Sequence, residues 1–476
     1  MIAKHKQLSL ADLFDNVQDF YQNDKPHFLS LLEQYIDLNQ LVPSSFADSY
    51  YSYYGRKRSY SLNSMLAFFI IQKILGIPHI SMMINIFKLS SDLRDYCGFE
   101  SIPDQAQFTR FKQNFSFELE HLFYHLVELT EPILDKINHE LADCLIYDTS
   151  GIEAYVTENN PKFLNYTIKS MKKYYKNKPD IDIYKMAYST LPDSANSNNN
   201  IKHLYINGHF CYAYKFGILT NGLGIVRHLA FLDDNFKNDH TELYQNNKSD
   251  SPEKDKSIGD STSLKPVIND FFQLHPDFKY DSFIGDSAFD SYQNYSFLLN
   301  NHSFNKAVIP LNTRNSKTSL PKGQYDENGW PTCPYDTSLS MKPDGWSYEK
   351  GRSPRHKFRC PKMQYKKGKE FLACDNPCTD SKYGRVIYTY PHQNFRTYPG
   401  IIRGTKQWDD FYKKRGVVEQ TINYFKQPMA IGQPKTQNDK TIKSDLFLAG
   451  ITQLLSVILA DKMHNNKILT LKSLIA

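Results

Sequence analysis

Four residues near the C-terminus have types and spacing that suit chemistry on a phosphate group. Tyr412, Arg415, Glu419 and Lys426 would share one stripe of a helix with about 3.6 residues per turn. This stripe offers a carboxylate between cations, and arginine binds phosphate as a planar fork whereas lysine acts as a point charge. The pattern favours a phosphate backbone held near a metal ion. The ordinary alternative is a surface helix with two ion pairs.

An apolar band runs beside this stripe. Phe411, Val418 and Phe425 recur every seven residues, which predicts that one edge of the helix is packed. The helix is therefore expected to be held in place along one edge and to present its charged stripe along the next.

Two aspartates add further carboxylates, each at the end of a predicted strand. Asp148 follows an apolar run from Cys144, and Asp286 follows a run from Tyr280. Ligand sites in α/β sheets lie outside the carboxyl ends of strands, so both can converge with Glu419. Converging carboxylates repel one another unless cations neutralise them, and hard oxygen ligands select Mg²⁺ or Mn²⁺, two of which serve phosphoryl displacement.

Each aspartate alone has a more ordinary interpretation. A single aspartate at a strand end is more often a turn former or a helix cap than a metal ligand. Asp290 fits that role, because it precedes a predicted helix from Tyr292 as an N-cap candidate. The joint occurrence of the three acids carries the metal-site hypothesis.

The elements around these acids predict a mixed α/β fold. Strand-like runs at 209–220 and 225–232 are joined by Asn221-Gly222, a strong hairpin signal. Helices are expected at 263–274 and 292–300, and a strand at 306–311. This order predicts a sheet with helices on its faces. We expect four regions: helical 1–138, sheet-containing 139–312, an insertion at 313–395, and C-terminal helices at 396–476 that complete the sheet-containing core and carry the third carboxylate. Within 139–312, the polar segments 157–205 and 235–262 are expected to be surface insertions with some disorder.

The N-terminal region is predicted to be all helical and to contain a DNA-binding arrangement. Short helices with tight turns include 64–76 and 105–115. In the second, the core-forming positions would be Phe108, Phe111 and Phe115. Candidate DNA contacts on its other sides are Gln107, Thr109, Arg110 and Lys112. A plain helical bundle with a solvated basic face is the alternative.

A family resemblance now becomes specific. The spacing Tyr-x2-Arg-x3-Glu-x6-Lys is similar to the signature of a large group of bacterial insertion-sequence transposases with a DDE catalytic domain. The segments 146–153 and 284–290 resemble the two aspartate motifs of that family. The segments 56–60 and 102–111 resemble its N-terminal DNA-binding region, so the likeness covers nearly the whole chain.

The resemblance implies an RNase H-like catalytic core in which Asp148, Asp286 and Glu419 bind the two ions. Tyr412, Arg415 and Lys426 would grip double-stranded DNA at the element's end. The reaction would be hydrolytic nicking at the ends, followed by attack of the freed 3′-hydroxyl on target DNA. Joining two ends to one target makes a homodimer the expected active form. A nuclease that does not join strands, or a non-catalytic DNA-binding descendant, are the alternatives.

The insertion contains a cysteine cluster and a basic stretch. Four thiols in a cytosolic protein suggest structural Zn²⁺, in which His356 could replace one thiol, with four free thiols as an equal alternative; the thiols are Cys333, Cys360, Cys374 and Cys378. Dense charge interleaved with aromatic residues favours salt-dependent backbone contact, against a solvated loop; its central cations are Arg355, Lys357 and Arg359. A weaker basic candidate lies at 169–178.

Composition permits this function without showing it. The chain has 476 residues, a net charge of +6 and a pI of about 8.6, which allows a nucleic-acid partner. The N-terminus lacks the apolar core of a signal peptide, and the most apolar run, 446–460, is interrupted by Thr452 and Gln453, so no membrane partner is expected. We expect the protein in the bacterial cytoplasm, at the nucleoid.

Overall fold

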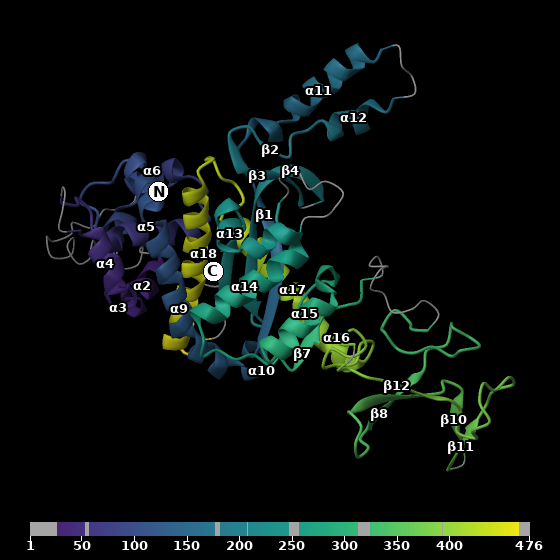
Figure 1. Cartoon of the computed structure of the whole chain (residues 1–476). Coiled ribbons are helices and arrows are strands. Elements are labelled where there is room, and N and C mark those ends of the chain that lie inside the picture. Colours follow the sequence, from purple (N-terminus) through teal and green to yellow (C-terminus); the bar gives the residue numbers. More distant parts are fainter. Residues whose placement is uncertain are drawn as a thin grey trace, which may run out of the picture. The chain divides into compact units, whose positions relative to one another are not determined.

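The computed structural model describes most of the chain, in two compact units (Figure 1). The described residues are 26–52, 57–176, 181–206, 208–246, 257–312, 324–366, 368–392 and 394–465. The first unit falls within Met1–Ile137, Ile152–Tyr155 and Asn423–Ala476, and the second comprises Asn138–Gly151 and Val156–Ile422.

The first unit is built from helices, as the sequence predicts. They are α2 (His27–Tyr35), α3 (Leu38–Leu41), α4 (Ser44–Tyr50), α5 (Leu62–Ile74), α6 (Ile80–Leu89), α7 (Ser91–Cys97), α8 (Gln105–Asn114), α9 (Ser116–Ile137) and α18 (Asp439–Lys462). The side chain of Asp104 caps α8 by accepting from the Gln107 amide at 2.7 Å. Phe108, Phe111 and Phe115 are buried, and the rings of Phe68 and Phe108 stack with centroids 3.7 Å apart. The predicted core face of α8 is confirmed.

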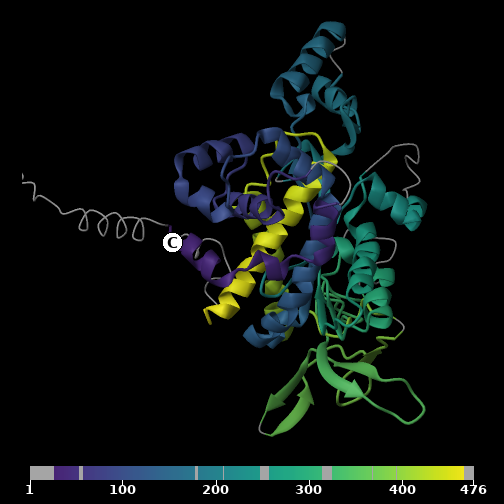
Figure 2. The same ribbon diagram turned by 90° about the vertical axis from the view of Figure 1, so that its left-hand side faces the viewer.

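The helix α18 is the apolar centre of this unit. It packs along α9 (Figure 2, yellow) and also contacts α5 and α8. By length and composition α18 could cross a membrane, but 89% of its most apolar window is buried inside the structure. Burial of this kind is what a core helix of a globular unit shows.

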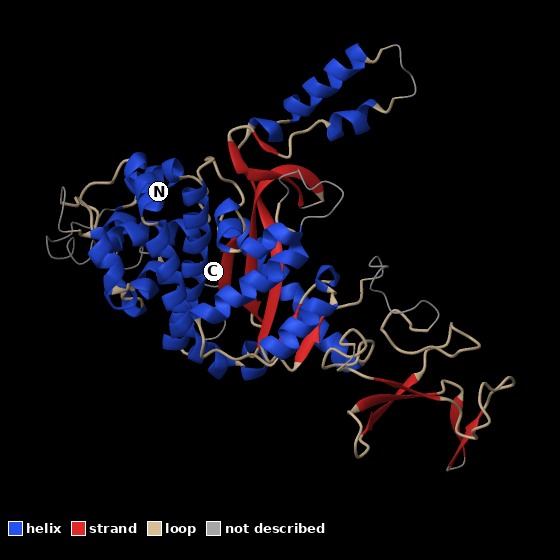
Figure 3. Ribbon diagram, viewed as in Figure 1, coloured by secondary structure: helices blue, strands red, loops and turns tan. Residues whose placement is uncertain are grey.

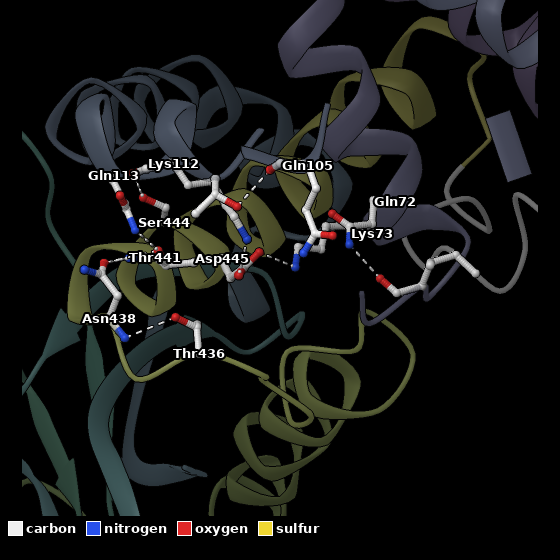
Figure 4. A network of polar contacts seen from close by, with 12 residues as sticks. Gln72, Lys73, Gln105, Lys112, Gln113, Thr436, Asn438, Thr441, Ser444 and Asp445 are labelled. Atoms are coloured by element: carbon white, nitrogen blue, oxygen red, sulfur yellow. Dashed lines mark hydrogen bonds and ion pairs between the residues drawn. The ribbon is translucent and has the colours of Figure 1, made fainter. Parts of the chain in front are cut away.

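A buried charge cluster ties α5, α8 and α18 together (Figure 4). Lys73 and Lys112 are 3% and 4% exposed, and their ammonium groups lie 2.9 and 2.7 Å from the two carboxylate oxygens of Asp445. The two cations hold the pKa of Asp445 at about 2, against the opposing effect of burial, which is the largest single influence. The pair of lysines therefore depends on Asp445 to be buried in charged form.

A seven-stranded mixed sheet organises the second unit. Its strands are β1 (Cys144–Glu153), β2 (Ser194–Ala195), β3 (Asn198–Ile206), β4 (His209–Asn221), β5 (Val226–Phe231), β6 (Ser282–Ile284) and β7 (Lys306–Val308), in the order β2-β3-β4-β1-β6-β7 with β5 also paired to β4. The pairs β1/β6 and β6/β7 are parallel, and β3/β4 and β4/β5 are antiparallel. The predicted strands and the mixed α/β class are confirmed.

Helices cover the sheet and bury its apolar side chains (Figure 3). The remaining helices and turns up to β7 are α10 (His139–Ala142), η1 (Thr157–Asn159), α11 (Pro161–Tyr174), α12 (Ile183–Ser189), α13 (Asp234–Asp239), η2 (Thr241–Asn246), α14 (Asp260–Leu274), η3 (Ser287–Phe289), α15 (Tyr292–Ser296) and the π-helical η4 (Phe297–Asn301). Leu145 and Phe283 of the central strands pack in one core cluster with Val267 and Phe271 of α14. Burial of these side chains fixes β1, which contains Asp148, and β6, which ends two residues before Asp286.

The loop between β4 and β5 contains the predicted Asn-Gly pair but is longer than a two-residue hairpin. The Asn221 side chain accepts hydrogen bonds from the Leu223 and Ile225 amides, at 3.1 and 3.0 Å. Gly224 has a φ of +79°. The side-chain bonds of Asn221 supply the turn instead of a type I′ geometry.

The polar segment 157–205 is more ordered than the sequence predicts. It contains α11 and α12, and its last part is β3, which extends the sheet beside β4. Asn159 explains part of this order, because its side chain exchanges two hydrogen bonds with the backbone of Tyr212 in β4. The expectation of surface insertions with some disorder is therefore corrected for the described part of this segment.

The insertion 313–395 forms a small β subdomain over its described residues. It has a three-stranded sheet, β12-β9-β8, and a two-stranded sheet, β10-β11. The bounds are β8 (Lys342–Ser347), β9 (Arg355–Arg359), β10 (Met363–Lys366), β11 (Lys369–Leu372) and β12 (Val386–Thr389), and the chain continues through α16 (Lys406–Tyr412), η5 (Lys413–Arg415) and α17 (Gly416–Lys426).

The domain boundaries differ from the prediction at the C-terminal end. The region 396–476 was expected to belong wholly to the catalytic core. The structure instead groups residues from Asn423 onward with the N-terminal helices. The reason is the all-round burial of α18 among α5, α8 and α9, which its apolar composition alone does not assign to either unit.

Candidate active site

The two predicted aspartates leave neighbouring parallel strands. Asp148 lies within β1, two residues after the Ile146↔Ile284 pair that sets its register against β6. Asp286 follows the end of β6 by two residues. Each carboxylate accepts a hydrogen bond from the next amide in the chain, Thr149 at 2.8 Å and Ser287 at 2.5 Å. The parallel register therefore places both acids at the same edge of the sheet, as expected.

The motif helix is interrupted, in contrast to the continuous helix that the spacing suggests. Tyr412 ends α16, Arg415 ends the 3-10 turn η5, and Glu419 lies in the first turn of α17. The apolar band is confirmed in part, since Val418 and Phe425 are fully buried. Short 3-10 turns are common at the ends of α-helices, and the residues that flank this one, Tyr412 and Gly416, keep right-handed helical dihedrals.

One guanidinium group gathers the three acids. Arg415 Nη1 donates to Glu419 Oε1 at 2.7 Å. Its Nη2 lies 3.4 Å from Asp286 Oδ2 and 3.7 Å from Asp148 Oδ2. Residues separated by more than 130 positions in the sequence thus meet around one cation, and all four belong to the second unit.

The negative charge of the three acids shifts the pKa values of the groups in this cluster, and it favours binding of a cation in addition to Arg415. Burial, aided by the charges of Asp286 and Asp260, raises the pKa of Asp148 to about 6, although Thr149 and Arg415 oppose the shift. The pKa of Arg415 is raised because the negative charges of Asp286, Asp148 and Glu419 together outweigh its burial. Burial also raises the pKa of Tyr412, with a contribution from the same three acids. The negative charge of the carboxylate cluster therefore favours the protonated form of the tyrosine hydroxyl.

The chemistry of the donor set fits Mg²⁺ or Mn²⁺. All three groups offer oxygen ligands, which hard divalent cations prefer. A cation bound at the partly buried Asp148 would lower the raised pKa of that carboxyl and favour its ionised form. Within the described residues, the three side chains do not bring one oxygen each within 4.8 Å of one another. Arg415 stands between them. Binding of an ion by all three would require its guanidinium to move aside.

A fourth acid near the site was missed by the sequence analysis. Asp260 begins α14, in a segment assigned to a polar insertion. Its Oδ1 accepts from Thr149 Oγ1 at 2.5 Å and lies 2.6 Å from Lys215 Nζ. Despite burial, Lys215 and Thr149 lower the pKa of Asp260. No signal in the sequence pairs Asp260 with Asp148; only the fold brings α14 beside β1.

The sequence predicts that Asp290 caps a helix, and the structure corrects this. Ser291 caps α15 instead. The buried Asp290 forms a two-point contact with Arg396, Nε to Oδ1 at 3.0 Å and Nη2 to Oδ2 at 2.6 Å. Arg403 donates to Tyr295 Oη at 2.8 Å, and Tyr295 donates to Asp290 at 3.1 Å. This network joins the segment leading to α16 to α15 and to Asp290, four residues after Asp286.

Two of the predicted DNA contacts are buried. Lys112 lies on the core side of α8 and pairs with Asp445, so the assignment of Lys112 as a DNA contact is corrected. Lys426, the last residue of α17, is 6% exposed, so it does not offer its ammonium group to a DNA surface in this structure. Arg110, on the same helix as Lys112, is exposed. The helical periodicity of the sequence does not show which of these cations are buried and which are exposed.

The three central cations of the basic stretch form ion pairs with acidic residues of the same insertion. Arg355 is buried, pairs with Glu349 at 2.5 Å and lies over the Tyr388 ring. Lys357 pairs with Asp344 at 2.8 Å, and Arg359 pairs with Glu370 at 2.8 Å. The prediction that Arg355 contacts DNA is wrong for this conformation. The other two cations would have to leave acidic partners that β8 and β11 bring across from elsewhere in the sequence.

The four insertion cysteines do not assemble into a metal site. Cys333 and Cys360 are buried, and Cys374 and Cys378 are partly exposed, all as free thiols. Among the described residues, no three of them, with or without His356, lie within 4.8 Å of one another through their ligand atoms. Tetrahedral zinc needs such convergence. The zinc hypothesis stays a prediction that this geometry does not support.

A comparison of the chain with protein families bears on the first unit. Residues 17–114 match the family described as "Transposase domain (DUF772)". The match is to a transposase domain. It covers α2 to α8 among the described elements, and thus includes the helix that carries Arg110. The similarity to a transposase domain is therefore carried by the helical unit, independently of the carboxylate cluster.

Two further comparisons add less. No curated protein matches the chain. Among solved structures, a piggyBac transposase synaptic complex with hairpin DNA, determined by cryo-EM, aligns at 10% sequence identity with a TM-score of 0.37, covering 96% of this chain and 80% of that one. That score is too low to establish a shared fold.

Proposed function

We propose that this protein is a metal-dependent DDE transposase that cuts DNA at the ends of its element and joins the freed 3′-hydroxyl to target DNA. The observation that carries the proposal is the gathering of Asp148, Asp286 and Glu419 around Arg415. The similarity of residues 17–114 to a transposase domain supports it from a separate part of the chain.

The sheet supports an RNase H-like core for this function. The antiparallel β4/β5 pair adjoins β1 on one side, and β6 and β7 lie parallel to β1 on the other. The three acids come from β1, from the end of β6 and from a helix after β7. This arrangement of strands and acids is expected of an RNase H-like nuclease or transposase core.

The roles of the residues follow from their positions. Asp148, Asp286 and Glu419 would hold Mg²⁺ or Mn²⁺, which supplies Lewis acidity to the scissile phosphate and to the attacking oxygen. Arg415, displaced from the acids, would present its planar fork to a DNA phosphate oxygen. Tyr412, partly buried beside the cluster and stacked on Trp408, would orient the DNA end. No side chain needs to form a covalent intermediate, because water and then the 3′-hydroxyl serve as nucleophiles.

The test is cleavage and strand transfer with duplex DNA carrying the element's ends, in Mg²⁺ or Mn²⁺. Asp148→Asn, Asp286→Asn and Glu419→Gln should each abolish both steps. Asp277→Asn is the matched control, because Asp277 is an exposed carboxylate of the same unit. Equal activity of all variants would refute the assignment. Cutting without joining by the wild-type protein would favour a nuclease, and binding without cutting would favour a non-catalytic DNA-binding protein.

A further inference from the structure

A pocket of about 300 Å³ lies on the first unit, beside the start of α5 and along α8. Three cations line it: Lys57, Arg58 and Arg110. Polar side chains from Ser59, Gln107 and Asn114 complete the rim, and no carboxylate of the described residues takes part. Its lining therefore has only positive and neutral groups.

Arg58 is fixed at this pocket by its own neighbours. Its Nε donates to the Tyr50 carbonyl oxygen at 3.0 Å. Its guanidinium carbon lies 5.0 Å from the Tyr50 ring centroid and 5.4 Å from that of Phe115, and both rings are buried. This support holds the guanidinium plane without using its two terminal nitrogens, for which no acceptor occurs among the described residues.

Arg110 supplies a second unpaired guanidinium. It is exposed on α8 and forms no hydrogen bond or ion pair with any described residue. Lys112, two positions later, is buried against Asp445. The helix thus uses one cation for its core and leaves the other at the pocket.

We propose that this pocket binds one backbone phosphate of duplex DNA, with Arg58 and Arg110 as the donors. Arginine matches phosphate oxygens in a planar, two-point geometry. A guanidinium that is held in position in advance loses less side-chain entropy on binding. Such a contact sets the position and register of the protein on DNA and carries little sequence information. The inference rests on the proposed function for its DNA partner and adds a site that is separate from the carboxylate cluster.

The experiment measures binding of a fluorescent duplex to the full-length protein across a salt series. Arg110→Gln should weaken binding roughly tenfold and should reduce the slope of log K against log salt concentration by about 1. Arg58→Gln should do the same. Lys136→Gln removes an equal charge from an exposed site at the end of α9 and should change affinity by less than about twofold.

Two further measurements distinguish DNA phosphate from free phosphate as the ligand, and the pocket proposal from the proposed function. Inorganic phosphate alone should bind far more weakly than the duplex; equal affinity would make this a small-anion site and overturn the inference. If the wild type cuts DNA while Arg110→Gln and Arg58→Gln keep its affinity and salt slope, the pocket proposal is wrong and the proposed function stands. If the pocket variants lose affinity but no protein cuts, the pocket proposal stands and the proposed function fails. Arg110→Gln keeps the test valid if Arg58→Gln does not fold, because Arg110 has no structural partner.

Discussion

Arg415 places its Nη2 atom 3.7 Å from Asp148 Oδ2, within a cluster where burial has raised the pKa of that carboxyl to about 6. The guanidinium therefore stabilises the ionised form of an acid that its surroundings would otherwise neutralise. The Arg415 guanidinium partly neutralises the carboxylates, a role that a bound divalent ion would take over.

Removing Arg415 should raise the pKa of Asp148 further, because a cation that favours the carboxylate is lost. In Arg415→Ala, the acidic limb of the cleavage profile should move to a pH above that of the wild type, and the maximal rate should fall. The pKa can be read directly by NMR titration of the metal-free protein. Lys413→Ala removes the same charge from a side chain that is 76% exposed, and should leave the limb in place.

Removing Asp260 should have the opposite effect. Its negative charge contributes to the raised pKa of Asp148, so Asp260→Asn should lower that pKa and extend activity to more acidic conditions. The same NMR titration checks the sign. A rise, or no movement at all, would show that Asp260 and Asp148 are not electrostatically coupled.

Asp148→Asn should stabilise the metal-free fold at neutral pH while it abolishes cleavage. The folded pKa of about 6 lies above the ordinary value of 3.8. The native state therefore binds the proton more tightly than the unfolded state, and stability falls as pH rises from about 4 to about 6. The variant avoids this loss, which is on the order of 3 kcal/mol. Thermal unfolding at pH 7.5 should show the gain, and at pH 4 the gain should be nearly absent.

The buried pair of lysines predicts a large dependence on Asp445. Asp445→Ala leaves Lys73 and Lys112 without their counter-ion and should cost about 3–5 kcal/mol in urea unfolding. Because the folded pKa of about 2 lies below 3.8, the stabilisation is fully present above about pH 4 and is lost as pH falls toward 2. Glu120→Ala, which breaks a partly exposed pair with Lys443, should cost about 1 kcal/mol or less.

Gly400 should tolerate no side chain. Its φ is +87°, and a Cβ atom there would lie 1.9 Å from the Asn305 carbonyl oxygen. Gly400→Ala should therefore cost roughly 3 kcal/mol or more. Gly345 has a similar φ of +81° with nothing within 4 Å of its Cβ position, so Gly345→Ala isolates the backbone strain at about 1 kcal/mol. Equal costs at the two glycines would contradict the close approach.

The sequence predicts much of the second unit because its signals are local. The apolar runs that end at Asp148 and Asp286 needed only strand periodicity, and the positions of β4, β5 and α14 followed from turn and helix patterns. The strand ends and the charged helix stripe predict that both aspartates meet Glu419, and the family motif predicts the same. The structure brings these acids around Arg415.

The parts that escaped prediction depend on partners distant in sequence. Lys112 and Asp445 are 333 positions apart, and Asp290 and Arg396 are 106 apart. Helical stripes and capping rules cannot show such pairs. The density of basic residues predicts a DNA contact at Arg355, but this side chain is buried against Glu349 and Tyr388. The sequence does not show this burial, because it depends on the pairing of β strands.

The Asp290 carboxylate has an architectural consequence. Its Oδ2 accepts from the Asn312 amide at 2.7 Å and from Arg396 Nη2 at 2.6 Å. These residues directly flank 313–395, so the chain leaves for its β subdomain and returns from it at a single anion. Such an attachment makes the subdomain a detachable module: lineages or engineers could shorten, exchange or delete it by re-linking two chain ends that are already pinned together.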